Sequence, residues 1–165
     1  MESKRITIIR GLRDSGKTTK QLELIEQQDP DISIIWVTPD FDDVPVPELL
    51  LSRGNLKAYG LDWSNLDMGI MLYVSYMEKR LLADSNPKPL YMAIDEIDLV
   101  YSVLTKNDFS WKGFIRNIQP STLEVANAYV CFTTQAITEE AYLWFIKILP
   151  RDLIDTITLE TVNNE

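Results

Sequence analysis

The chain has 165 residues, which is enough for one domain with a buried core and too few for two ordinary domains. It contains no histidine and one cysteine, Cys131. Histidine catalysis, structural zinc and a disulfide framework are therefore excluded, and a cytoplasmic location is expected (the host cytoplasm if virus-encoded). A net charge of −9 counts against a large nonspecific nucleic-acid surface. No apolar run approaches the ~18 residues of a membrane span, so residues 1–165 are expected to form a single soluble domain.

Strands and helices are expected to alternate along the chain. Residues 32–38 and 90–94 are near-continuous apolar runs, typical of strands buried on both faces of a parallel sheet. The expected strands cover Arg5–Arg10, Ile32–Thr38, Leu90–Ile94, Ala128–Thr134 and Ile154–Val162. Helices are expected from Lys17 to about Gln28, over the apolar positions Leu66, Ile70, Tyr73, Met77 and Leu81, after Pro120, and over Glu139–Ile148. A capping box of Ser121 and Glu124 is expected to begin the helix after Pro120. This alternation indicates a three-layer α/β domain with a mainly parallel sheet flanked by helices.

The segment GLRDSGKTT, residues 11–19, matches G-x-x-x-x-G-K-[ST] between an expected strand and an expected helix. In such a loop, backbone N–H groups and the helix N-terminus bind phosphate, while Lys17 reaches the β- and γ-phosphates and Thr18 holds Mg²⁺. The acid Asp14 should repel phosphate, so its side chain is expected to point outward, toward Arg13. The predicted nucleotide-binding residues are Gly11, Asp14, Ser15, Gly16, Lys17, Thr18 and Thr19.

The segment LYMAIDEIDLV places two acids directly after an apolar strand, as a Walker B element does. Asp95 would bind Mg²⁺, directly or through water, and Glu96 would be the general base that polarises an attacking water. An acidic strand-to-helix turn without function is the alternative reading of this segment alone. The preceding phosphate loop favours the functional reading.

The segment VCFTTQ ends an apolar strand with a polar triplet. Ligands in open α/β sheets lie beyond the carboxyl ends of the strands, so Gln135 is expected to face the crevice of Lys17 and Glu96. There it would sense the γ-phosphate or the water. An ordinary polar strand terminus is the alternative.

These three motifs resemble the additional-strand catalytic-glutamate branch of P-loop NTPases. Within that branch, the Thr–Gln strand end and the closing segments YLWFIKILP, Arg151 and IDTITLE resemble the FtsK/HerA superfamily of DNA-pumping ATPases. The order of elements agrees over most of the chain, and residue identity is specific only at the three motifs.

The resemblance implies a five-stranded sheet in which the strand ending in Gln135 separates the Walker A and Walker B strands. It also implies ATP and Mg²⁺ as ligands. Lys17 and Thr18 would bind nucleotide and metal, Asp95 would bind the metal, Glu96 would be the catalytic base and Gln135 the sensor.

Two arginines are candidates for a catalytic arginine finger that reaches a neighbouring subunit. Arg151 directly follows Pro150, whereas the family tends to place a residue between the proline and the arginine. Arg116, between the Walker B and sensor strands, is the rival candidate.

The leading hypothesis is ATP hydrolysis coupled to translocation or packaging of DNA through a homo-oligomeric ring, by a minimal motor of viral or plasmid type. One alternative is a protein-handling ATPase, such as the filamentous-phage assembly proteins, whose substrate is a protein or a protein–DNA complex; the acidic balance favours it. A small-molecule or nucleoside kinase is less favoured, because the seven arginines are scattered singly and form no lid cluster.

Overall fold

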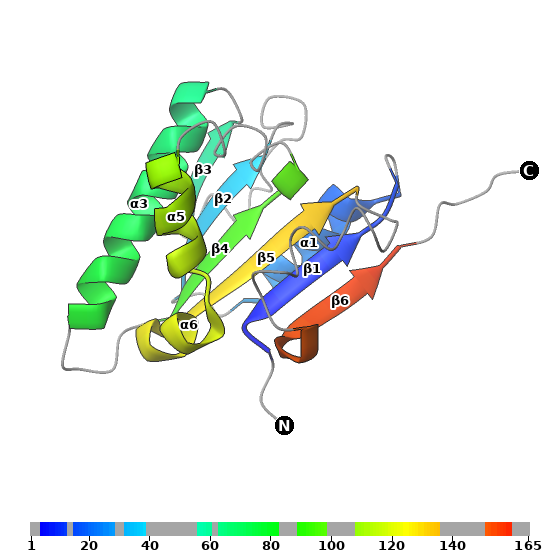
Figure 1. The fold of residues 1–165 in the computed structure, drawn as a ribbon. Coiled ribbons are helices and arrows are strands. Elements are labelled where there is room, and N and C mark those ends of the chain that lie inside the picture. The colour runs from blue at the N-terminus through cyan, green and yellow to red at the C-terminus, as the bar shows by residue number, and fades with distance from the viewer. Residues whose placement is uncertain are drawn as a thin grey trace, which may run out of the picture.

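The computed structural model describes residues 4–12, 15–28, 32–38, 56–60, 63–82, 89–98, 108–135 and 151–159. Six parallel strands form one sheet in the order β3-β2-β4-β5-β1-β6 (Figure 1). The strands are β1 (Ile6–Arg10), β2 (Ser33–Thr38), β3 (Leu56–Gly60), β4 (Leu90–Ile94), β5 (Ala128–Thr134) and β6 (Ile154–Thr158). The helices are α1 (Lys17–Glu26), α3 (Trp63–Leu82), α5 (Asp108–Arg116), α6 (Pro120–Ala126) and the 3-10 turn η1 (Arg151–Leu153).

The three-layer α/β class predicted from the sequence is confirmed, and all five expected strands are present in parallel. The predicted position of β5 between β1 and β4 is also confirmed. A sixth strand, β3, adds to the five by pairing with β2 at the edge of the sheet. Its sequence, LKAYG, is short and interrupted by a lysine, so it lacks the continuous apolar run of an inner parallel strand.

Helices cover both faces of the sheet (Figure 1). On one face lie α3, α5 and α6, where Tyr73 and Phe114 are buried against the sheet residue Phe132. The Phe114 ring centroid lies 6.4 Å from that of Tyr73 and 6.1 Å from that of Phe132. On the other face, Ile25 of α1 belongs to a second buried cluster that includes Trp36 of β2. The sheet is therefore apolar on both faces, as its sequence predicted.

Several elements differ from expectation. Helix α6 begins at Pro120 with Gln119 as its N-cap and no side-chain cap, so the expected capping box is wrong. Proline suits the first helical position, and this places Ser121 inside the first turn instead of at the cap. Helix α1 ends at Glu26, and α5 was not expected at all. The expected helix over residues 139–148 lies outside the described residues.

A buried amide fastens α1 to the sheet. The Gln21 side chain is fully buried, and its Nε2 donates to the carbonyl oxygens of Ile94 and Cys131 at 3.1 and 3.0 Å. Its Oε1 accepts a hydrogen bond from Trp36 Nε1 at 3.3 Å. One side chain thus links α1 to β2, β4 and β5, one turn after Lys17. Burial raises the pKa of the Cys131 thiol to about 11, so this thiol stays protonated and is not a nucleophile at neutral pH.

Replacing Gln21 with leucine is expected to lower the free energy of unfolding by about 1–3 kcal/mol, because the indole N–H of Trp36 loses its acceptor. Urea unfolding measures this change, with Gln27→Leu as an exposed control that should stay within about 0.5 kcal/mol of wild type. In the Gln21→Leu/Trp36→Phe double variant the loss should be smaller than the sum of the single losses. Simple additivity would contradict the coupling of the two side chains.

Candidate active site

The described residues between β1 and α1 include two glycines at positions that favour glycine. Gly16 is the N-cap of α1 with a φ of 92°, a left-handed conformation that glycine adopts without steric cost. A side chain at Gly11 would collide with the hydroxyl of Ser15. The Gly11 N–H donates to the carbonyl oxygen of Thr134 at 3.2 Å, so the loop begins beside the end of β5. Helix α1 begins directly after this loop. The N-terminus of a helix, with its unpaired backbone N–H groups, is a common binding site for anions.

A buried lysine and a buried hydroxyl group lie where this loop meets α1. Lys17 is 5% exposed, and its Nζ donates to the carbonyl oxygen of Leu12 at 2.7 Å. The Ser15 hydroxyl is buried and has no hydrogen-bond partner among the residues that the structure describes. A buried hydroxyl without a partner is costly, and a phosphate oxygen would supply the acceptor. Thr19, in contrast, is exposed on α1.

Hydroxyl groups join the phosphate loop to the acidic strand end. Thr18 Oγ1 donates to Asp95 Oδ2 at 2.8 Å, and Thr133 Oγ1 donates to Asp95 Oδ1 at 2.7 Å. The Asp95 side chain is 1% exposed, and its backbone N–H donates to the carbonyl oxygen of Val37 at 2.7 Å. The first turn of α1 and the ends of β4 and β5 therefore meet at one carboxylate.

Glu96 follows Asp95 in an uncommon backbone conformation. Its φ is 65°, in the left-handed region that costs a residue with a Cβ free energy. Its N–H donates to Thr133 Oγ1 at 2.7 Å, which holds this conformation. The Gln135 side-chain amide donates to the two carboxylate oxygens of Glu96 at 3.2 and 3.3 Å. The predicted base and the predicted sensor are thus in contact.

The two candidate arginines lie away from the phosphate loop. Arg116 ends α5, on the face of the sheet opposite α1; its side chain is 73% exposed, with its Nη2 4.0 Å from Glu78 Oε1 on α3. Arg151 begins η1, immediately before β6, whose first residue Ile154 pairs with Ile6 at the start of β1. Figure 1 shows η1 at the end of the sheet opposite the phosphate loop. The predicted pairing of Arg13 with Asp14 lies outside the described residues.

Sequence reasoning missed Asp98. Its carboxylate accepts hydrogen bonds from the Thr134 hydroxyl at 2.8 and 2.9 Å and from the Gln135 backbone N–H at 2.9 Å. The same rule that pointed to Gln135, namely that polar groups beyond parallel strands share one edge, would have pointed to this third acid of the segment DEID. Gln21 was also missed, because a glutamine within an amphipathic helix gives no signal of burial.

The residues present fit a magnesium ion bound together with a nucleotide. Mg²⁺ is usually held by one or two carboxylates plus substrate phosphates instead of an all-protein cage. Asp95 offers a carboxylate and Thr18 a hydroxyl at 2.8 Å from it, beside the loop that would hold the phosphates. Among the described residues no group of three or more His, Cys, Asp or Glu side chains could hold a metal by itself.

Solved structures similar to this chain include ATPase domains. The cytoplasmic domain of the type VII secretion ATPase EccC of Thermomonospora curvata has a TM-score of 0.63 and 13% sequence identity over 94% of this chain and 19% of that chain. ATPases 2 and 3 of EssC from Geobacillus thermodenitrificans have a TM-score of 0.60 and 13% sequence identity, over 97% of this chain and 33% of that chain. A further structure, described as an ATPase, has a TM-score of 0.55 and 10% sequence identity, over 80% of this chain and 56% of that chain. This chain has the fold of those ATPase domains.

The ATPase fold is established here by structure alone. No protein-family model matches the sequence, and no curated protein matches it either. The chain spans between about a fifth and just over half of the length of these structural neighbours. Membership of the FtsK/HerA superfamily therefore stays a prediction. In the part of the chain that the structure describes, no helix combines the length and the apolar character that crossing a bilayer requires.

Proposed function

We propose that this protein is an ATPase that hydrolyses ATP with the help of Mg²⁺. The observation that carries the proposal is that Thr18 and Thr133 both donate hydrogen bonds to the buried carboxylate of Asp95. This carboxylate lies next to Glu96 and the phosphate loop. The hydroxyl of Thr18, the last residue of the eight-residue Walker A pattern, lies 2.8 Å from Asp95 Oδ2 of the Walker B segment, which supports a shared site. The likeness to ATPase domains supports the same conclusion.

The residues of the site would divide the binding and the chemistry of this reaction among them. Lys17 and the loop N–H groups would bind the β- and γ-phosphates, and the free Ser15 hydroxyl would donate to a phosphate oxygen. Mg²⁺, held by Thr18 and Asp95, would neutralise charge on the phosphates. Glu96 would accept a proton from the attacking water, and Gln135, already in contact with Glu96, would orient that water or the γ-phosphate.

Lys17→Ala is expected to abolish tight binding of Mg²⁺–ATP, because it removes the buried ammonium that pairs with the phosphates. Calorimetric titration of nucleotide into the variant measures this loss. Lys20→Ala is the matched control: Lys20 lies one turn further along α1, pairs with Glu23 at 3.7 Å and should leave binding unchanged. Wild-type affinity in the Lys17 variant would show that the loop does not bind phosphate.

We propose further that hydrolysis drives a polymer through a homo-oligomeric ring. The strand-end Thr134–Gln135 pair and the closing β6 support the FtsK/HerA resemblance, which points to DNA. A protein substrate is the second candidate, because one structural neighbour is a secretion ATPase and another is described in complex with a signal sequence peptide. The net charge of −9 also favours a protein over DNA.

Polymer stimulation distinguishes these candidates. ATPase rates are measured at constant protein concentration with duplex DNA, with single-stranded DNA and with an unfolded polypeptide, while sedimentation with Mg²⁺–ATP reports the assembly state. Stimulation by DNA that weakens steeply with salt would support the DNA motor. Stimulation by polypeptide alone would favour the protein-handling reading. ATP hydrolysis that no polymer stimulates, by a protein that does not assemble, would contradict the motor proposal. The proposed ATPase activity would still stand.

A further inference from the structure

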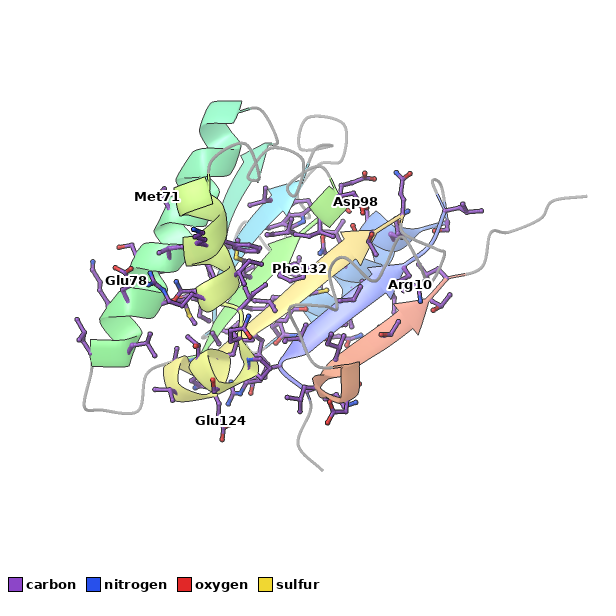
Figure 2. The ribbon with its side chains drawn as sticks, in the orientation of Figure 1. Arg10, Met71, Glu78, Asp98, Glu124 and Phe132 are labelled. Atoms are coloured by element: carbon purple, nitrogen blue, oxygen red, sulfur yellow. The ribbon has the colours of Figure 1, made fainter. Side chains whose placement is uncertain are left out.

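The carboxylate of Asp98 lies beyond the ends of two neighbouring strands of the sheet. Figure 2 shows Asp98 at the carboxyl edge, next to the tip of β5. It accepts hydrogen bonds from the Thr134 hydroxyl and from the Gln135 backbone N–H, with the same Oδ2 oxygen 2.9 Å from both donors. These contacts hold the first residue after β5 to the segment that follows the Walker B acids.

The contacts form a closed ring of residues. Glu96 is joined to Asp98 through the chain, Asp98 accepts the Gln135 backbone N–H, and the Gln135 side-chain amide donates back to Glu96 at 3.2 and 3.3 Å. Gln135 itself is exposed, so packing does not fix its side chain. Its direction depends on where its backbone is held. Asp98 supplies that restraint, because it binds both the N–H of Gln135 and the hydroxyl of the residue before it.

Thr134 also contacts the start of the segment that follows β1. It is 2% exposed, its hydroxyl donates to Asp98 and its carbonyl oxygen accepts the Gly11 N–H at 3.2 Å. The contact with Gly11 is made by backbone atoms, so it does not depend on the Asp98 carboxylate. Misplacing a catalytic group by about 1 Å can slow a reaction about 10²-fold, since positioning supplies much of the rate of phosphoryl transfer.

We propose that Asp98 is a positioning residue that aims Gln135 at Glu96 and the reacting phosphate, an inference that rests on the proposed ATPase function. It contacts neither nucleotide nor water in this role and acts through Gln135. Asp98→Ala should therefore lower kcat by about 10- to 100-fold and leave the affinity for ATP near wild type. Asp98→Asn keeps an oxygen that can accept both hydrogen bonds, so it should recover most of the lost rate.

The first test does not depend on hydrolysis. Amide hydrogen exchange of the folded protein, followed by NMR, reports whether the Gln135 N–H is held. Asp98→Ala should speed exchange at Gln135 by about tenfold or more, Asp98→Asn should restore slow exchange, and Asp155→Ala, an exposed acid on β6, should change nothing there. Unchanged exchange at Gln135 in the folded Asp98→Ala protein would overturn the proposal. If that variant does not fold, Thr134→Val removes one of the donors to Asp98 and serves in its place.

The second test is a double-mutant cycle on kcat. If Asp98 acts through Gln135, then Asp98→Ala should cost little in a Gln135→Ala background. A full, additive loss in that background would overturn the positioning role. A wild-type protein that binds ATP but does not hydrolyse it would contradict the proposed function instead. The exchange experiment alone would then decide whether Asp98 holds Gln135.

Discussion

Glu96→Gln is expected to leave ATP binding intact and to slow hydrolysis by about 10²-fold or more, which is the usual scale of general-base catalysis. The substitution keeps the size of the side chain and removes the carboxylate that would accept the proton of the attacking water. The backbone hydrogen bond from Glu96 N–H to Thr133 would be retained, so the fold of the turn should not change. Steady-state turnover, together with calorimetric binding of Mg²⁺–ATP, measures both halves of the prediction.

Glu124→Gln provides the matched control for this experiment. Glu124 is an exposed glutamate on α6, near the amino ends of the strands (Figure 2), and its replacement should not affect turnover. Near-normal hydrolysis by Glu96→Gln would show that this glutamate is not the base. It would also favour the kinase reading, since a kinase keeps water away from the γ-phosphate and has no need to activate it.

Removing the arginine that acts between subunits is expected to lower the assembled rate by roughly 10³- to 10⁵-fold, the measured range for arginine fingers. Arg116 and Arg151 both belong to elements remote from the phosphate loop of their own chain, so either could act only on a neighbour. We therefore expect a slow monomeric ATPase whose specific activity rises steeply with protein concentration or with an added polymer. Arg116→Ala or Arg151→Ala should remove that rise without weakening ATP binding.

Mixing two inactive proteins tests whether the site is shared. The arginine variant has intact acids and the Glu96→Gln variant has intact arginines, so an excess of the second should restore hydrolysis at the sites of the first. Glu78→Gln, which breaks only the 4.0 Å ion pair of Arg116, serves as the control for local disruption of α3 and α5. No restoration, with a specific activity independent of concentration, would mean that each subunit works alone.

The three motifs could be read from the sequence because each is a local pattern. An apolar run of five or six residues predicts an inner strand, and polar residues directly after it must lie at the carboxyl edge of a parallel sheet. Gly11 and Gly16 were predictable because they belong to the local Walker A pattern, and the structure shows a close approach of Ser15 at Gly11 and a positive φ at Gly16. The order of β4, β5 and β1 followed from the family resemblance and not from spacing.

The tertiary structure decided which distant groups meet. No local pattern indicates that Gln21 bonds to Ile94 and Cys131, that Asp98 holds Gln135, or that β3 completes the edge of the sheet. Such contacts depend on the register between strands. A shift of one residue would turn Thr133 and Thr134 each to the other face of the sheet and separate them from Asp95 and Asp98. The sequence by itself predicted the Walker A pattern and the acids that follow β4. Their assembly into one site was decided by strand pairing, since pairing sets the distances between residues far apart in the chain.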